Sequence, residues 1–380
     1  MTTVSMQQCD SYQAELLQER LAALLAPLGG IERFVAAGQR VLLKPNMLAG
    51  KPPEAAVTTH PALVQAVAEL VKNAGGIVLV GDSPGIGLFE QVARKTGIKA
   101  AVEASGATLR PFDRTRQIAA GGLFRQLELA EAYLDADVVI NLPKLKTHEM
   151  MTLTCGVKNL YGAVVGPAKA ALHLTAGRSK ELFAGLLLEI AQARPVALTI
   201  VDGIVAMEGN GPNSGTPRQL GMLLAGDSPV AVDTVAAELV GIPHRLLPVQ
   251  QEAKRRGLPG SSLDQIVLVG QLPLQPAEPP FVLPDGLDLQ FGLPGFVKPI
   301  LRDSLSPLPC ADPQRCVLCG ICRDACPPQA ITITKNALKV DSGRCIRCWC
   351  CRELCPHHAL LLKKGAALKI LERYRAFRAS

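Results

Sequence analysis

The chain has 380 residues, of which 48% are hydrophobic, so it is long enough for one large core and a second, small domain. Its formal net charge of +7 does not indicate nucleic-acid binding, because aromatic residues make up only 4% and no basic run carries interleaved stacking residues. No apolar stretch reaches the ~18 residues of a membrane-spanning helix, and the N-terminus lacks a secretory pattern, so we predict a cytoplasmic protein without a transmembrane segment.

The first 270 residues are predicted to form an α/β domain preceded by a helix. Leucines from Leu16 to Leu25 lie on one face of a helical pattern, which predicts an N-terminal helix within residues 1–35. From 36 to 270, apolar β-branched runs alternate with amphipathic stretches, which indicates a mainly parallel sheet covered by helices. Strands are predicted at 40–44, 77–81, 107–112, 137–141, 196–201, 221–225 and 265–269. Helices are predicted near 61–74, 88–96, 179–193, 229–241 and 247–256.

Polar residues follow five of these strands. Ligands of open α/β sheets bind beyond the carboxyl ends of the strands, where loops and helix N-termini converge. A helix cap gives the same pattern at a single position such as Asp227, so the repetition is what indicates a binding site. The predicted ligand-binding residues are Lys44, Asn46, Asp82, Ser83, Lys144, Lys158, Asn159, Asp202, Glu208 and Asn210.

The segment 141–159 has the densest set of reactive side chains. Its lysines would attract a carboxylate or phosphate, and His148 has an ordinary pKa close to neutral pH. We therefore predict His148 and Lys146 as catalytic residues. The alternative is a histidine satisfied by internal hydrogen bonds beside solvated lysines. The glycine-rich loop 202–212 can close over a ligand or hold a hard cation.

Several of these residues form blocks that resemble a known family. The blocks are Lys44-Pro45-Asn46, Asp82-Ser83 followed by Gly85, Lys144-x-Lys146-Thr147-His148 leading to Lys158-Asn159, and Asp202-Gly203 with Glu208-Gly-x-Gly211-Pro212. They resemble the prokaryotic domain-of-unknown-function family 362 over roughly residues 36–245. The resemblance implies no reaction, but it implies that a ferredoxin module often accompanies the domain. No Walker loop or G-x-G-x-x-G fingerprint occurs, so a nicotinamide or ATP site is not indicated, whereas a flavin stays open.

The C-terminal region contains two cysteine runs, after a proline-rich segment at 271–309 that is predicted to be a linker or a wrapping segment. Both runs read C-x2-C-x2-C-x3-C-P, in which the fourth cysteine binds the other cluster. Residues 310–362 are therefore predicted to form a small α+β domain that resembles two-cluster bacterial ferredoxins. One 4Fe-4S cluster is assigned to Cys316, Cys319, Cys322 and Cys355, and the other to Cys345, Cys348, Cys351 and Cys326. The alternative, structural zinc, has no use for the third cysteine of each run.

The last segment, 363–380, is predicted to be a basic amphipathic tail that packs on the protein or docks on a membrane surface or partner. Three functions are compatible with these patterns. The first is a ferredoxin-coupled oxidoreductase that takes electrons from a redox partner protein and relays them to an anionic substrate or cofactor. The second is an electron carrier with a partner-binding domain, and the third is a cluster- or metal-handling assembly protein. The lysine-rich strand ends favour the first, because a carrier does not require them.

Overall fold

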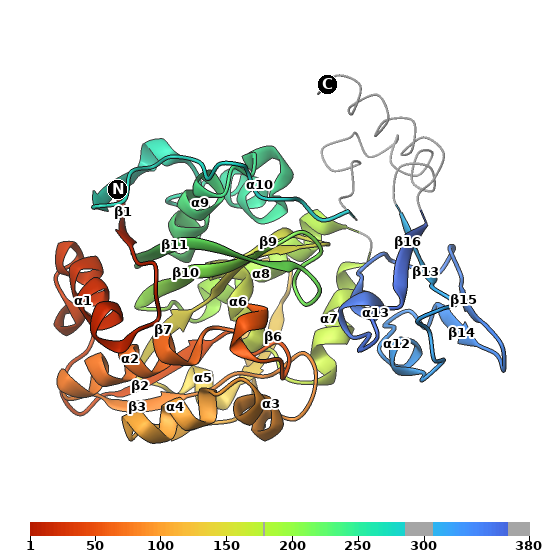
Figure 1. The fold of residues 1–380 in the computed structure, drawn as a ribbon, viewed down its shortest axis with the longest axis horizontal. Helices are drawn as coiled ribbons and strands as arrows, with labels where there is room; N and C mark the ends of the chain where they lie inside the picture. Colours follow the sequence, from red (N-terminus) through yellow and green to blue (C-terminus); the bar gives the residue numbers. More distant parts are fainter. Residues whose placement is uncertain (178, 286–306, 364–380) are drawn as a thin grey trace.

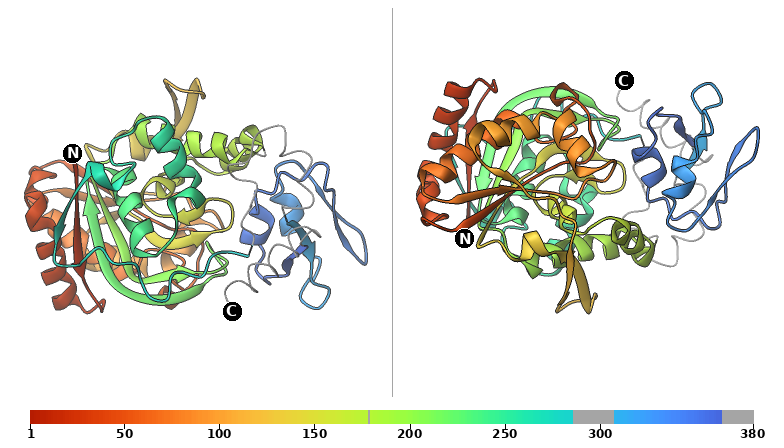
Figure 2. Two further views of the ribbon diagram at one scale, coloured as in Figure 1. Left: turned by 90° about the horizontal axis from the view of Figure 1, so that it is seen from above. Right: turned by 90° about the horizontal axis from the view of Figure 1, so that it is seen from below.

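The computed structural model describes residues 1–177, 179–285 and 307–363, which form two units (Figure 1). The larger unit, residues 1–285, is a sheet between two layers of helices. The smaller unit, residues 307–363, lies at one end of the larger one in all views (Figures 1 and 2). The predicted α/β class with a small second domain is therefore confirmed.

The large sheet is formed by ten strands of the described residues. They are β1 (Thr2–Gln8), β2 (Arg40–Pro45), β3 (Ile77–Val80), β4 (Thr108–Leu109), β7 (Val138–Leu142), β8 (Lys144–His148), β9 (Thr152–Thr154), β10 (Leu198–Glu208), β11 (Thr216–Gly226) and β12 (Ile266–Gly270). Eight of them follow the order β12–β1–β11–β10–β7–β2–β3–β4, while β8 pairs with β10 and β9. Strand β11 is antiparallel to β1 and β10, β8 is antiparallel to β9, and the other pairs are parallel. A separate hairpin consists of β5 (Thr115–Ala119) and β6 (Gln126–Ala130).

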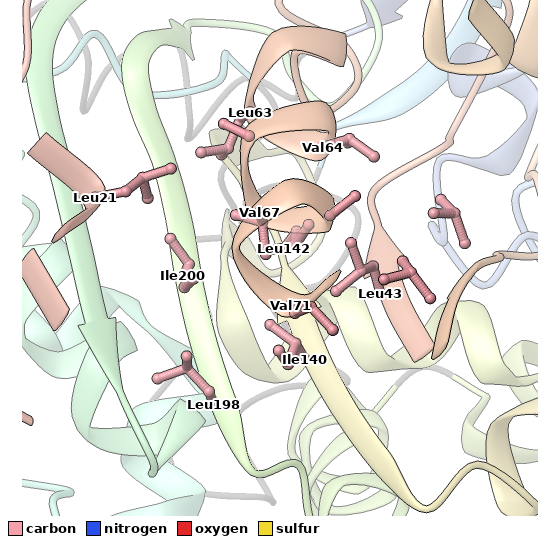
Figure 3. Close-up of a cluster of buried hydrophobic side chains, with 14 of the residues drawn as sticks. Leu21, Leu43, Leu63, Val64, Val67, Val71, Ile140, Leu142, Leu198 and Ile200 are labelled. Carbon is pink, nitrogen blue, oxygen red and sulfur yellow. The ribbon is translucent and has the colours of Figure 1, made fainter. Parts of the chain in front are cut away.

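Helices cover both faces of the sheet. They are α1 (Ala14–Leu25), α2 (Pro61–Asn73), α3 (Phe89–Lys95), α4 (Ile98–Ser105), α5 (Glu131–Leu134), α6 (Gly156–Asn159), α7 (Pro167–Ala176), α8 (Lys180–Ala193), α9 (Pro229–Leu239) and α10 (Pro248–Arg255), with 3-10 turns at 26–28, 31–33, 53–55, 160–163, 244–246 and 263–265. Val41 and Leu43 of β2 pack against α1–α4, whereas Leu42 points to the side of α8 and α10. Figure 3 shows the first of these cores, with Val67 and Val71 of α2 above the strands. Burial on both faces explains why the strands are nearly continuous apolar runs.

The structure corrects the prediction for the N-terminus. Residues 1–35 are not one helix, because β1 precedes α1 and lies between β11 and β12. Ser5 and Gln7 of β1 are buried together with Val4 and Met6, so this strand lacks the alternation of polar and apolar residues by which strands are recognised. The strands β8 and β9 are also absent from the prediction, since their polar residues do not form an apolar run.

The small unit has an internal two-fold repeat. Its elements are β13 (Leu308–Ala311), α12 (Ile321–Asp324), β14 (Ile331–Ile333), β15 (Leu338–Val340), α13 (Cys350–Glu353) and β16 (Leu360–Lys363). β13 pairs with β16 and β14 with β15, and both pairs are antiparallel. Left-handed backbone at Leu318, Gly320 and Gln329 recurs at the equivalent places of the second cysteine run, which are Arg347, Trp349 and His358. Each run therefore follows the same path, with a short helix after its second cysteine.

The proline-rich segment wraps the large unit as far as residue 285. Its Val282 carbonyl accepts a hydrogen bond from the Gly209 N–H at 2.7 Å, and Phe281 is buried against the core. The remainder of the predicted linker, 286–306, lies outside the described residues. The predicted tail also lies outside them, except for Lys363, which ends β16.

Side chains of the small unit pack on the large unit. Arg352 of α13 forms an ion pair with the buried Glu149, and the Asn213 amide donates a hydrogen bond to the Glu353 carbonyl at 2.8 Å. Trp349 is 3% exposed and belongs to the same apolar cluster as α8. Polar and apolar contacts thus hold the small unit in one orientation.

Burial raises the pKa of Glu149 to about 8, so its carboxylate is mostly charged only above that pH. At about pH 9 we expect Glu149→Gln to weaken this docking by about 1–3 kcal/mol, because Arg352 would then lose a charged partner at a nearly closed interface. Hydrogen exchange should then accelerate at residues 307–363 and stay unchanged in β2 and β7. Glu103→Gln is the matched control, since the Glu103 side chain is 65% exposed on α4. Equal exchange in the two variants would show that the ion pair does not hold the small unit.

Candidate functional site

A cavity of about 400 Å³ lies between the two units, beyond the carboxyl ends of β2 and β3. The small unit contributes Ala325, Cys350, Glu353 and Leu354 to its wall. The polar residues from the large unit are Asn46, Asp82, Ser83, Lys146, His148, Thr154, Lys158, Asn159, Tyr161, Lys169 and His173. Seven residues predicted from the sequence are among them, which are Asn46, Asp82, Ser83, Lys146, His148, Lys158 and Asn159.

The hairpin of β8 and β9 positions the central side chains. Lys146 and His148 are two residues apart on β8, so they lie on the same face of the strand. In the antiparallel register Lys146 is opposite Thr154, and directly opposed residues bring their side chains together on one face. Both residues line the cavity.

Three asparagines hold Lys146 in place. The Asn141 amide donates to the Gly156 carbonyl at 2.9 Å, so its oxygen is free to accept the Asn159 amide at 2.8 Å. Asn159 accepts the Asn46 amide at 2.9 Å in the same way, which leaves the Asn46 oxygen as an acceptor for Lys146 Nζ at 3.0 Å. A chain of amides that starts at a backbone carbonyl thus determines which end of Asn46 meets the lysine.

Lys146 Nζ has a second acceptor, the Val57 carbonyl at 2.6 Å. Burial lowers the pKa of Lys146 to about 7, and the positive charge of Lys158 contributes in the same direction. A substantial fraction of this side chain is therefore a neutral amine at neutral pH.

His148 is held as a neutral imidazole. Its Nδ1 accepts hydrogen bonds from the backbone N–H groups of Met150 at 3.0 Å and Met151 at 3.2 Å, so its ring proton is on Nε2. Nε2 lies 3.4 Å from Glu353 Oε1 of the small unit. Burial lowers the pKa of His148 well below its ordinary value, and the positive charges of Lys158 and Lys146 lower it further. In this arrangement His148 is a hydrogen-bond donor at the cavity rather than a base.

Two further lysines provide positive charge. Lys158 Nζ lies 5.7 Å from the Tyr161 ring centroid, and no hydrogen-bond acceptor contacts it within the described residues. Lys169 donates to the Ser83 carbonyl, to Ser83 Oγ at 3.0 Å and to the Pro84 carbonyl at 3.3 Å. Burial lowers the pKa of Lys169 to about 8 and also lowers that of Lys158. An oxyanion bound in the cavity would raise the pKa values of both lysines.

Lys44 and Asp82 form a buried ion pair at 2.8 Å beside the cavity. Asp82 also accepts the Met47 N–H at 2.8 Å, so it positions the loop after β2. Gly162 packs against this pair, and a Cβ there would lie 2.1 Å from Asp82 Oδ1. Lys44 is thus neutralised inside the protein and does not line the cavity.

The remaining predicted residues lie elsewhere. Lys144 Nζ pairs with Asp202 at 2.8 Å, and Asp202 also accepts the Tyr12 hydroxyl at 2.6 Å. Glu208 pairs with Arg218 at 2.9 Å, and Asn210 exchanges hydrogen bonds with Asp285. The structure therefore does not bring Lys144, Asp202, Glu208 and Asn210 to the cavity, and the loop after Asp202 is instead part of the long strand β10 up to Glu208.

Sequence reasoning missed Lys169, His173, Tyr161, Glu353 and Cys350, which all line the cavity. Lys169 and His173 are four residues apart on α7 and therefore share a helix face, a spacing that is visible in the sequence. Glu353 lies inside the second cysteine run, and only the packing of the two units brings it to His148.

The cysteines of the small unit are all free thiols. Cys316, Cys319, Cys322 and Cys355 line one small pocket. The Ala330 N–H donates to Cys326 Sγ at 3.2 Å, and the Ala359 N–H donates to Cys355 Sγ at 3.3 Å at the equivalent place. Within the described residues, no group of three or more His, Cys, Asp or Glu side chains is arranged around a single metal ion. The pocket is small, about 10 Å³, but its four thiols and the N–H···S bonds are the donor types that a thiolate-bound cluster uses.

Comparisons with known proteins show the family of the chain. The family described as Domain of unknown function (DUF362) matches residues 41–238, more than half of the chain. The chain belongs to the DUF362 family. The DUF362 match begins in β2 and ends in α9, so it includes the cavity residues of the large unit.

A relative of this DUF362 protein is the thylakoid-associated protein sll1697 of Synechocystis sp., which is 42% identical over 256 residues, covering 67% of this chain and 80% of the relative. Among solved structures, the lactate racemase apoprotein from Thermoanaerobacterium thermosaccharolyticum matches with a TM-score of 0.40 and 13% identity. That match covers 63% of this chain and 56% of the racemase. No helix in the described part of the DUF362 protein has the length and apolar composition that a bilayer crossing requires.

Proposed function

We propose that this DUF362 protein is an iron–sulfur redox protein that binds two 4Fe-4S clusters and passes electrons to an oxyanion-bearing ligand in the cavity. Bound clusters would supply single electrons. The proposal is supported by the two cysteine runs and by the pocket that Cys355 of the second run shares with Cys316, Cys319 and Cys322 of the first.

One observation carries the link between clusters and cavity. Helix α13 contains Cys351, a proposed cluster ligand, together with Cys350 and Glu353, which line the cavity. Ala325, next to the proposed ligand Cys326, lines the same cavity. A ligand in the cavity would therefore be adjacent to the cluster held by Cys345, Cys348, Cys351 and Cys326.

The residues of the large unit would hold the ligand. Lys158 has no acceptor among the described residues, so its ammonium group is available to an oxyanion. His148 lines the same cavity with Nε2 3.4 Å from Glu353 Oε1, and its Nε2–H group would stabilise negative charge that develops there. Leu48 and Ile86 form apolar parts of the wall, beside which electrostatic interactions are stronger than in bulk water.

An electron carrier would not need this cavity, so we favour a ferredoxin-coupled oxidoreductase over a carrier. The other proposed cluster is closer to solvent, because Cys319 is exposed and the neighbouring Val317 is 62% exposed. We propose that a redox partner protein delivers electrons there. We also propose a cytoplasmic location, which is supported because none of the twelve cysteines forms a disulfide.

Anaerobically purified protein should contain about eight iron atoms and about eight acid-labile sulfides per chain. Cys351→Ala should lower both to about four, because it removes a proposed ligand. The control is Cys350→Ala, which should retain about eight irons, since Cys350 lines the cavity and is not a proposed ligand. Zinc in place of iron, or equal iron loss in the two variants, would refute the cluster assignment.

A further inference from the structure

We propose that Lys146 forms an imine with the carbonyl carbon of an oxo acid bound in the cavity, and that Lys158 binds the carboxylate of that acid. This inference rests on the proposed function in one respect, since it takes the cavity as the ligand site. It names the substrate class of that site as carbonyl-bearing carboxylates.

The hydrogen-bond partners of Lys146 match a neutral amine. A neutral amine has two N–H donors, and Lys146 Nζ has two acceptors, Asn46 Oδ1 and the Val57 carbonyl. The remaining tetrahedral position then carries the lone pair, which is the nucleophile in imine formation. Three other lysines instead have partners suited to an ammonium group. The partner is Asp82 for the buried Lys44, Asp202 for the buried Lys144, and three oxygens of Ser83 and Pro84 for the half-buried Lys169.

The environment of Lys146 favours the reactive form. A buried lysine beside a second cation is a recognised way to activate an amine nucleophile. Burial lowers the pKa of Lys146 to about 7, and Lys158 is the largest electrostatic contributor in the same direction. The negative charges of Glu353 and Asp82 raise the pKa of Lys146, whereas the positive charge of Lys144 lowers it further. The charge of Glu353 favours the ammonium form of Lys158. Among the described residues Lys158 makes a cation–π contact with Tyr161 but no hydrogen bond or ion pair, so its N–H groups are available for the ligand carboxylate.

Thr154 provides a hydrogen-bond partner for the carbonyl oxygen. It lies opposite Lys146 in the β8–β9 pair and is 3% exposed. Its Oγ1 is buried without a hydrogen-bond partner, although Thr154 lines the cavity. A buried hydroxyl without a partner is unfavourable unless a ligand supplies one. Because Thr154 is directly opposite Lys146 in the strand pair and both line the cavity, its Oγ1 is the hydroxyl that would meet the carbonyl oxygen of the ligand.

The proposed step needs no oxidant or reductant. The lone pair of Lys146 attacks the carbonyl carbon, a C–N bond forms, and the carbonyl oxygen becomes the hydroxyl of a carbinolamine. The C–O bond then breaks, and the oxygen leaves as water with the two hydrogens that were on the amine. The product is a C=N bond between Lys146 and the oxo acid. Thr154 would donate a hydrogen bond to the oxygen during this step.

The test is reductive trapping on the full, anaerobically purified chain. The protein is incubated with pyruvate and sodium cyanoborohydride, and its intact mass and peptide map are measured. We expect one adduct per chain, located at Lys146, and we expect the initial trapping rate to rise about tenfold from pH 6 to pH 8 as the amine loses its proton. The control Lys99→Arg, on an exposed lysine, should trap like the original protein.

Three variants make the test sharper. Lys146→Arg should abolish the adduct, Lys158→Met should slow trapping at least about tenfold, and Thr154→Val should slow it while keeping the fold, because Thr154 Oγ1 has no partner to lose. An adduct spread over surface lysines, or one that persists in Lys146→Arg, would overturn the inference. If iron-loaded protein formed no adduct, the imine alone would be overturned. If anaerobically purified protein contained no iron but still formed the adduct at Lys146, only the cluster proposal would be overturned.

Discussion

Iron will fall from about eight to about four atoms per chain when Cys355 is replaced by alanine, and the lost cluster will be the one held mainly by the first cysteine run. The reason is that Cys355 lines the same pocket as Cys316, Cys319 and Cys322. The two-fold repeat of the small unit predicts the reciprocal result for Cys326→Ala, which should remove the cluster held mainly by the second run.

Double variants distinguish this crossed arrangement from one in which each run binds its own cluster. Cys316→Ala with Cys355→Ala removes two ligands of one cluster, so about four irons should remain. Cys316→Ala with Cys326→Ala removes one ligand from each cluster, so nearly all iron should be lost. Ligand sets that do not cross would give the opposite pair of results. Cys310→Ala, outside both runs, is the control and should keep about eight irons.

Asp202→Asn will destabilise the protein by about 3–5 kcal/mol, because it leaves the Lys144 ammonium buried without a countercharge. Both side chains are at most 1% exposed, and Asp202 also accepts hydrogen bonds from the Tyr12 hydroxyl and the His60 N–H. The free energy of unfolding from urea titrations measures the effect. This loss of stability should become smaller as the pH rises toward about 10. Burial lowers the pKa of Lys144, so the unfolded chain holds the Lys144 proton more tightly than the folded protein does. Raising the pH therefore removes the buried charge from the folded protein first.

Asp227→Asn is the matched control for this prediction. Asp227 lies 3.9 Å from Arg33 at the surface, with side chains 47% and 57% exposed, and such pairs contribute about 0–1 kcal/mol. Adding Lys144→Met to Asp202→Asn should recover part of the stability, because the unpaired charge is then removed. If Asp202→Asn were as mild as the control, the Lys144–Asp202 pair would not contribute to folding.

Most of the large sheet could be predicted from local patterns. The helices α2, α8, α9 and α10 and the strands β2, β7 and β12 lie within about two residues of their predicted bounds. They are runs whose apolar period survives in the sequence because each is buried in a regular way. β1 was missed since it buries Ser5 and Gln7, and β8 was missed since it buries two lysines and a histidine.

The candidate site was only partly predictable, and Lys144 and Lys146 show why. The two lysines are two residues apart on β8, and nothing in the sequence separates them. The register of β8 against β10 places Lys144 beside Asp202, whose carboxylate neutralises it. Lys146 meets Asn46 instead and lines the cavity.

Sequence alone determined the apolar periods, the polar strand ends and the spacing of the cysteines, because each of these is a relation between residues close together in the chain. Tertiary structure decided which charges meet. Lys146 is kept without a carboxylate partner, and His148 faces Glu353, because two units pack in one particular way. Electrostatic and hydrogen-bond energies depend on distances through space, and those distances join residues that are far apart in sequence.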